Sequence, residues 1–360
     1  MGKRIIILIY QMKNLFIYIL LTVILISCSK DGESLVDPDA LTDHEIMAHS
    51  NNRVSSLLMT KNEYKNWVDN DEFTNSEKRT SLTNDIYKKY ADKYDFIFFI
   101  LNEPSIPENL SYYGKLIGVS NNVEGTGQGI YDYSTQYGSS GKLKAIMQLT
   151  GLEYLRGGPA LHELAHNWAN FGIDSHYIDG PGNNISSFNY KPHWGFTGGS
   201  SRGQLGGFDQ NTLIENGGNS YTVNSFGGFA NGGNGVPFNE LELYLMGMIS
   251  PSQVSDFDVF TDITSFSVNE NKFIFSANNR VTHNSSSLES LLGKRIPNSN
   301  DSQKNFKILS IVITDSPLTE DEWDRVDATA EWFSKKGDDG SSLYNFWEAT
   351  NGQGSIDIEN

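Results

Sequence analysis

The chain has 360 residues, and a hydrophobic fraction of 38% with 12% aromatic residues is typical of a folded protein rather than a disordered one. Its formal net charge of −17 at pH 7 implies an acidic surface, which repels nucleic acid and anionic lipid headgroups. The composition therefore argues against a nucleic-acid-binding role, and the length is sufficient for one large two-lobed domain or two ordinary ones.

The first 27 residues are predicted to be a secretory signal peptide. Three cationic residues and no acidic one accompany an apolar run, Leu15–Ile26, that is too short to span a bilayer as a helix. The run ends in "LISC", which resembles a bacterial lipoprotein box, and Cys28 is the only cysteine in the chain. This resemblance implies that Cys28 is lipidated and becomes the first mature residue. Loss of the leader with its three cations would change the net charge from −17 to −20.

Residues 28–41 are polar and are predicted to be a tether behind the lipidated cysteine. An acyl chain on Cys28 would hold the protein on a membrane without a spanning helix, because each buried CH₂ group contributes about 0.8 kcal/mol. The segment "SKDGES" directly behind Cys28 resembles the acidic surface-export tag of some bacterial lipoproteins. This resemblance implies a location on the bacterial cell envelope, as an outer-membrane lipoprotein that is exposed at the surface.

Helices and strands are predicted to follow one another between residues 42 and 150. Leu82, Ile86 and Tyr90 fall on one face of a helix, and the continuous apolar run that follows Asp95 favours a strand buried on both faces. The predicted elements are helices within 42–70, a helix at 76–94, and strands at 95–101, 115–121 and 143–150.

A further helix is predicted from Pro159 to Gly172. Proline fits the first helical position, where a missing N–H costs nothing, and glycine fits the position after the helix end. The apolar side chains expected to pack under the sheet are Leu161, Leu164, Ala165 and Trp168.

Between Gly195 and Gly235 the sequence is rich in glycine, asparagine and serine, which predicts long irregular loops. Within this stretch, residues 212–223 are predicted to form a hairpin about Gly217-Gly218. A phosphate-binding loop is excluded, because no Gly-Lys-Ser/Thr sequence occurs and the net charge is negative. The last predicted elements are an amphipathic helix at 238–248, a strand at 306–314 and an acidic helix at 319–333.

The segment "HELAH", residues 162–166, has the pattern of a zinc-binding helix. Residues four apart share a helix face, so His162 and His166 can direct nitrogens at one ion, at the Zn–N distance of about 2.0–2.1 Å. Glu163 is rotated by about 100° around the helix, so it can flank the ion and act as a general base without binding it. The bare pattern arises by chance in roughly one chain in a hundred, but the predicted helix and preceding strands favour a metal site.

This helix and the strands before it, roughly residues 80–172, resemble the zincin metallopeptidases. The resemblance implies an α+β fold with Zn²⁺ as the cofactor. An N-terminal lobe, residues 42–172, would place a mixed sheet over the active-site helix. A C-terminal lobe, residues 173–360, would contribute Gly-rich loops, helices and a small sheet. The resemblance also implies an edge strand that binds an extended substrate, and residues 143–150 are the expected edge strand.

A zinc site of this type needs a third protein ligand. Metzincins place Gly three residues and His six residues after the second histidine, where this chain has Ala169 and Gly172, so that subfamily is excluded. The thermolysin-like arrangement uses a more distant Glu, and the corresponding region here contains none. We favour His193, because zinc prefers imidazole nitrogen and the chain could return beneath the helix at this residue. The alternatives are His176, the second choice, and Asp179 and Glu242. For Glu242 the favoured interpretation is a carboxylate that is solvated or that contacts a ligand rather than the metal.

Roles other than metal binding are predicted for Met246, three further histidines and three tyrosines. Met246 resembles the methionine turn below the metal in metzincins, but a core methionine at helical spacing is the favoured interpretation. The histidines expected at the surface are His44, His49 and His283. The candidate donors to the oxyanion of a tetrahedral intermediate are Tyr177, Tyr190 and Tyr244.

The sequence therefore predicts a zinc-dependent metallopeptidase on the cell envelope, with Glu163 as the general base and a protein or peptide as the substrate. One alternative is a non-catalytic surface lipoprotein that binds glycan or protein with its Gly- and aromatic-rich loops. A degenerate zincin that keeps the fold and binds a partner is the other. The peptidase requires bound zinc, whereas the non-catalytic lipoprotein does not.

Overall fold

The fold is described from a computed structural model. It describes residues 43–169, 171–173, 175–179, 184–188, 193–227, 233–270 and 272–360. The predicted signal peptide and tether, with the lipidation residue Cys28, lie outside the described residues, as does Tyr190. Within the described part, no helix is both long and apolar enough to cross a bilayer.

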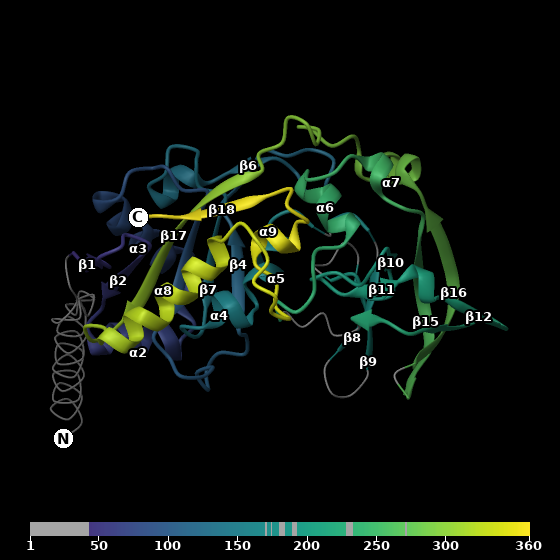
Figure 1. The fold of residues 1–360 in the computed structure, drawn as a ribbon, viewed down its shortest axis with the longest axis horizontal. Coiled ribbons are helices and arrows are strands. Elements are labelled where there is room, and N and C mark those ends of the chain that lie inside the picture. The colour runs from purple at the N-terminus through teal and green to yellow at the C-terminus, as the bar shows by residue number, and fades with distance from the viewer. Residues whose placement is uncertain are drawn as a thin grey trace, which may run out of the picture. The chain divides into compact units, whose positions relative to one another are not determined.

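The largest element of the fold is a seven-stranded mixed sheet. Its strands are β1 (Glu45–Ala48), β2 (Val54–Leu58), β3 (Phe96–Leu101), β4 (Gly114–Gly118), β7 (Ala145–Leu149), β17 (Asn305–Thr314) and β18 (Ser355–Ile358). Their order is β1-β2-β17-β3-β7-β4, with β18 also paired to β17 (Figure 1). The inner strands pair in parallel, whereas β1 and β4 run antiparallel to their neighbours.

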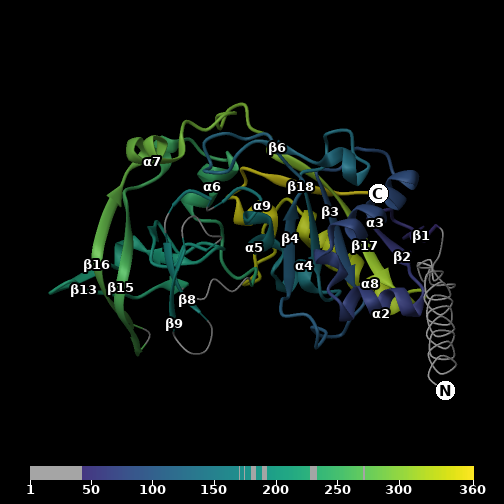
Figure 2. The same cartoon turned by 180° about the vertical axis from the view of Figure 1, so that it is seen from behind.

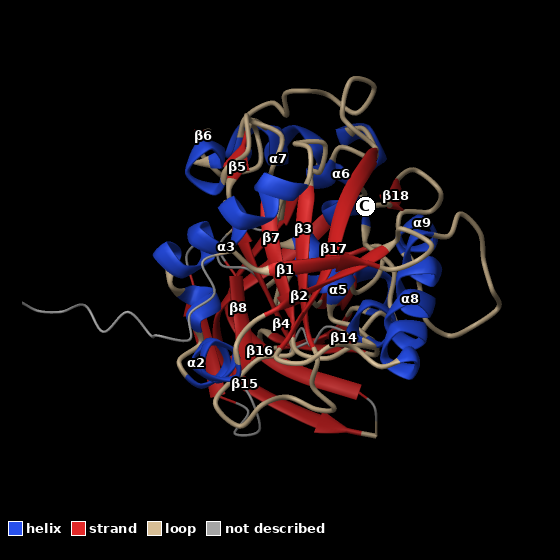
Figure 3. Ribbon diagram, turned by 90° about the vertical axis from the view of Figure 1, so that its left-hand side faces the viewer, coloured by secondary structure: helices blue, strands red, loops and turns tan. Residues whose placement is uncertain are grey.

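Helices cover both faces of this sheet (Figure 3). They are α2 (Lys61–Asp69) and α3 (Ser76–Lys89) on one face, and α8 (Glu320–Ser334) and α9 (Phe346–Ala349) on the other. Every residue of β3 is buried, because Phe98 faces the core under α8 while Phe99 faces the core under α2 and α3. This confirms the prediction of a strand buried on both faces.

The helices begin where their sequences provide caps. Thr60 and Glu63 form a capping box at the start of α2, and Thr319 and Glu322 form another at the start of α8. In each box the threonine hydroxyl accepts a backbone N–H and the glutamate accepts the N–H of the threonine, so two otherwise unpaired donors are satisfied.

Smaller sheets lie between residues 175 and 283. Their strands are β8 (Ser175–Asp179), β9 (Asn184–Phe188), β10 (Gly198–Gly199), β11 (Gly207–Asp209), β12 (Ile214–Gly217), β13 (Ser220–Val223), β14 (Phe226–Gly227), β15 (Phe257–Asn269) and β16 (Lys272–His283). A long hairpin joins β15 to β16 (Figure 2). The hairpin predicted about Gly217-Gly218 is confirmed as β12–β13, and it pairs with β16. A cluster of phenylalanines that includes Phe196, Phe208 and Phe275 forms the core of this part.

Short elements connect the sheets. They are β5 (Ser120–Asn121), β6 (Tyr131–Asp132), α4 (Tyr154–Gly157), α5 (Ala160–Ala165), α6 (Glu240–Met246) and α7 (Ser285–Leu292). The fold as a whole is a mixture of helices and several separate sheets, in agreement with the predicted α+β class.

The edge strand differs from the prediction. Residues 143–150 were expected at the edge of the sheet, but β7 lies between β3 and β4. The edge next to α5 is instead β4, which pairs antiparallel with β7 through Gly114–Gly118. An apolar run in the sequence does not show whether a strand lies inside a sheet or at its edge. In the structure the inner strand β7 is fully buried, whereas the edge strand β4 is only half-buried.

Two other segments depart from the predictions. The first half of 42–70, expected to be helical, forms β1 and β2, and only α2 is a helix there. The strand predicted at 306–314 exists as β17, but it lies between β2 and β3 rather than in a separate C-terminal sheet. The main sheet therefore contains strands from both sides of residue 172. Strand β17, from the second part of the chain, pairs with β2 and β3 from the first part.

Candidate metal centre

Helix α5 carries His162 and Glu163, is followed by His166 as its C-cap, and is buried along its whole length. Leu161 and Leu164 belong to the core beneath the main sheet, so the helix is held by apolar packing on its inner side. His162 and Glu163 are also buried, at 6% and 8% exposure, although both are polar. Burial of two adjacent polar side chains is costly unless each has a partner.

The helix is shorter than predicted. Pro159 is its N-cap rather than its first helical residue, and the α-helix ends at Ala165 rather than near Gly172. Beyond it, the N–H groups of His166, Asn167 and Trp168 bond to carbonyls three residues back, at 3.0 to 3.2 Å. The chain thus tightens into turns of the 3₁₀ type, which are frequent at helix ends.

Three imidazole rings converge at this helix. His162 Nε2 lies 3.1 Å from His166 Nε2 and 3.3 Å from His193 Nε2. One nitrogen from each ring lies within 4.8 Å of the other two. The structure therefore brings together the three histidines that the sequence analysis favoured, although His193 lies 27 residues beyond His166 in the chain.

The three nitrogens have the spacing and the protonation state that a metal ion requires. A tetrahedral Zn²⁺ with Zn–N bonds of about 2.0–2.1 Å holds its ligand atoms roughly 3.3–3.4 Å apart, close to the two distances found. Burial lowers the pKa of His162 to about 4 and that of His193 to about 3, and it lowers the pKa of His166 well below 6.5. All three rings are therefore neutral near pH 7, as metal ligands must be.

The orientation of His162 is fixed by a backbone carbonyl. Its Nδ1 lies 2.8 Å from the carbonyl oxygen of Gln204. Because a carbonyl can only accept, Nδ1 carries the proton and Nε2 presents its lone pair to the other two rings. A second contact of this kind is typical of metal-binding histidines. On His166 the buried Nδ1 has no hydrogen-bond partner among the described residues.

Glu163 and His166 line the same pocket. Its volume is about 380 Å³, and edge strand β4 contributes Gly114, Lys115 and Leu116 to its wall. Burial raises the pKa of Glu163 to about 7, while the Leu116 N–H and the Lys115 ammonium act in the opposite direction. A carboxyl group with a pKa near neutrality, in the same pocket as His166, is suited to proton transfer.

Gly114 allows β4 to approach the helix that carries Glu163. A Cβ at this position would lie 2.6 Å from Pro159 Cγ and 2.9 Å from Glu163 Cγ. We expect Gly114→Ala to lower the free energy of unfolding by about 1–3 kcal/mol, because an extra methyl group overfills a packed core. Urea-induced unfolding measures this change.

The control for Gly114→Ala is Gly129→Ala, at an exposed position in the loop between β5 and β6. There the added Cβ would have no atom within 4 Å apart from its chain neighbours, so the free energy of unfolding should not change. A Gly114→Ala protein as stable as the wild type would contradict the close packing of β4 against α5.

The other candidate residues lie elsewhere. His176, Tyr177 and Asp179 belong to β8, and their side chains lie outside the part that the structure describes. Tyr244 and Met246 are buried in the core on α6, at 1% exposure each. The histidines outside the cluster are His44, between Glu63 and Asp85, His49, stacked on Trp323, and His283, stacked on Phe257. The side chain of His44 is only 7% exposed, so the expectation of a surface histidine is wrong there.

One contributor to the site escaped the sequence analysis. The Gln204 carbonyl is a backbone atom 42 residues from His162, and no side-chain pattern marks it. Glu242 was an alternative third ligand, with a carboxylate that is solvated or that contacts a ligand as the favoured interpretation; it is fully buried beneath the loop that contains Gln204 and is not part of the histidine cluster. Burial raises its pKa to about 7, and four N–H donors act in the opposite direction.

Comparison of the chain with protein-family models, with curated proteins and with solved structures finds no match. The geometry and chemistry of the residues are therefore the basis on which a function can be proposed.

Proposed function

We propose that the protein is a zinc-dependent metallopeptidase of the zincin type. The observation that carries this proposal is the convergence of three neutral imidazole nitrogens beside a pocket lined by the buried carboxyl group of Glu163. His162, His166 and His193 would hold the metal. Three histidines that leave one coordination position open are the donor set of a catalytic zinc site rather than of a closed structural one.

The arrangement around α5 supports a zincin-like architecture with two lobes. The mixed sheet packs on the helix through β4 and β7, and the loops and small sheets after residue 193 bring the third histidine from the other side. Edge strand β4 has no strand on its outer side among the described residues, so this edge is open to an extended peptide except at Leu116, whose N–H is directed at the Glu163 carboxyl group. The proposed substrate is therefore a protein or peptide in extended conformation.

Glu163 would accept and donate the proton that moves during amide-bond hydrolysis. Bound zinc supplies a Lewis acid that polarises the scissile carbonyl and activates water. The Glu163 carboxylate would take a proton from the attacking water as the C–O bond forms, and would then transfer this proton to the leaving nitrogen as the C–N bond breaks. The Gln204 carbonyl keeps His162 in the tautomer that binds metal.

The location proposed for this activity is the outer face of the cell envelope. The signal-like leader and the lipoprotein box at Cys28 support it. Lipidation of Cys28 would anchor the enzyme on the membrane, while residues 28–41 would separate it from the lipid surface.

Metal analysis of the purified protein tests the proposal. We expect about one zinc ion per chain, because the three histidines form one mononuclear site. We also expect cleavage of a fluorescently labelled unfolded protein that stops on chelation and returns when zinc is restored. A protein that is purified without metal, does not bind added zinc and is unaffected by chelators would favour the non-catalytic glycan- or protein-binding lipoprotein.

A further inference from the structure

We infer that Glu242 is a positioning residue that holds two of the three histidines in the geometry that binds metal; the inference rests on the proposed metal centre. Glu242 lies on α6 and is completely buried, at 0% exposure. It is not a member of the histidine cluster, so any effect on the metal must pass through its neighbours.

The carboxylate of Glu242 accepts four hydrogen bonds, two on each oxygen. Oε1 accepts from Leu205 N at 2.7 Å and from Trp194 Nε1 at 3.1 Å. Oε2 accepts from Asn239 N at 2.9 Å and from Gln204 N at 3.1 Å. Three of these four donors belong to the loop that begins at His193 and returns at Leu205.

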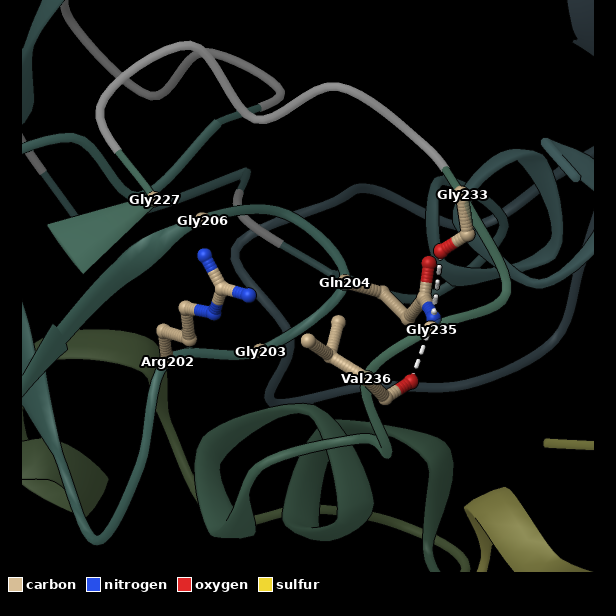
Figure 4. Close-up of a pocket in the computed structure, with 8 residues that line it drawn as sticks. All are labelled: Arg202, Gly203, Gln204, Gly206, Gly227, Gly233, Gly235 and Val236. Carbon is tan, nitrogen blue, oxygen red and sulfur yellow. Dashed lines mark hydrogen bonds between the residues drawn. The ribbon is translucent and has the colours of Figure 1, made fainter. Parts of the chain in front are cut away.

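Two of these bonds position His162. Gln204 presents its carbonyl to His162 Nδ1 at 2.8 Å, and the N–H of the same peptide unit, that of Leu205, bonds to Glu242 at 2.7 Å. Gln204 also donates its own N–H to Glu242, and its side chain donates to the carbonyl oxygens of Val236, at 2.6 Å, and Gly233, at 3.4 Å (Figure 4). The residue that orients His162 is therefore held through both its backbone and its side chain, and Glu242 is the charged partner.

Another pair of bonds positions His193. Trp194 follows it directly in the chain, is completely buried, and donates its indole N–H to Glu242. The Trp194 backbone N–H also bonds to the Leu205 carbonyl at 2.8 Å, while Leu205 donates its own N–H to Glu242. The two ends of the loop are thus joined at one carboxylate, which fixes the start of the segment that carries His193.

The position requires a carboxylate and leaves no room beside it. All four partners are N–H donors, so the NH₂ group of a glutamine would face two donors in either orientation. Gly203 makes the close approach possible, because a Cβ there would lie 2.4 Å from Glu242 Oε2. The loop therefore packs against the Glu242 carboxylate at Gly203 without space for an additional side-chain atom.

The test compares Glu242→Gln with Glu322→Gln in the full chain. Each glutamate lies three residues after the residue that begins its capping box, on α6 and α8 respectively, and each accepts the backbone N–H of that residue, Asn239 at 2.9 Å and Thr319 at 2.7 Å. Glu322 belongs to neither group of described side chains that could hold a metal ion, so the second variant reproduces the loss of a helix cap without touching the loop. Zinc affinity is measured by competition with a chromophoric chelator, and the visible spectrum of the Co²⁺-substituted protein reports on ligand geometry.

We expect Glu242→Gln to weaken zinc binding about 10–100-fold, the usual effect of losing a group that orients a metal ligand, and to alter the Co²⁺ spectrum. Glu322→Gln should leave both unchanged. A folded Glu242→Gln protein with wild-type zinc affinity and Co²⁺ spectrum would overturn the inference while leaving the metal centre in place.

A metal-free measurement separates this inference from the proposed function. In protein labelled with ¹⁵N-histidine, the His162 ring should show a protonated Nδ1 in the wild type, and this signal should change in Glu242→Gln. If the wild type binds no zinc but this difference appears, the metallopeptidase is refuted and the positioning role stands. If neither protein shows the protonated Nδ1, the positioning role is refuted.

Trp194→Phe provides a milder variant in case Glu242→Gln does not fold. It removes one of the four donors and keeps an aromatic ring in the core. We expect zinc binding to weaken about fivefold, the effect of losing one hydrogen bond, whereas an unchanged affinity would count against the inference.

Discussion

Glu163→Gln is expected to reduce the rate of peptide hydrolysis by about 10²–10⁴-fold, the usual contribution of a general base, while zinc remains bound. The side chain lines the pocket together with His166 but does not belong to the histidine cluster. Glutamine has almost the same shape, so the buried site keeps its packing, but its amide cannot take a proton from water. The measurement is kcat for a labelled peptide, together with the zinc content of the same sample.

Glu153→Gln is the control for this substitution. Glu153 is an exposed carboxylate ten residues earlier, and it is paired with Arg325 at 3.0 Å on the surface. Its replacement should leave kcat unchanged, because exposed ion pairs contribute little and this residue is remote from the pocket. Hydrolysis at the wild-type rate by Glu163→Gln would refute the role of Glu163 as the base.

The sequence predicted the elements whose signals are local. The apolar run of β3, the acidic helix α8 and the turn between β12 and β13 each follow from residues within one short window. The same holds for the first two histidines and Glu163, because their relative placement needs only one turn of helix. Such features depend on neighbours in the chain and little on the rest of the fold.

Features that depend on distant pairing were predicted wrongly. The inner position of β7 is decided by β4 on one side and β3 on the other, and the place of β17 by strands more than 200 residues earlier. The end of α5 was also misplaced, because the chain tightens after Ala165 although the apolar pattern continues to Trp168. In each case tertiary packing overrides a local pattern.

The third ligand of the proposed metal centre depends both on residue type, which the sequence gives, and on contacts between distant residues, which it does not. Chemistry favoured histidine, so His193 and His176 were the leading candidates, but nothing in their local sequence decides between them. What brings His193 to the cluster is the loop held by Glu242 and Trp194, together with the hydrogen bond from Ser175 Oγ to the His193 carbonyl at 2.8 Å. These contacts link residues from three separate stretches of the chain.

His193→Ala is expected to lower zinc affinity by more than the 10–100-fold that loss of an orienting group causes, because it removes a ligand atom itself. Zinc that binds the folded state at about 100 times its Kd adds about 2.7 kcal/mol to the free energy of unfolding. In the wild type, chelation should therefore lower the midpoint of thermal unfolding. In His193→Ala, added zinc or chelator should leave that midpoint nearly unchanged.

His176→Ala is the matched control, since His176 was the other imidazole considered for the third position. Its replacement should preserve both zinc affinity and the shift of the unfolding midpoint on chelation. His166→Ala should behave like His193→Ala, because its Nε2 lies 3.1 Å from that of His162 in the same cluster. If His176→Ala lost zinc while His193→Ala retained it, the metal would be held by a different set of nitrogens. Glu242 would then have no proposed ligand to position through Trp194.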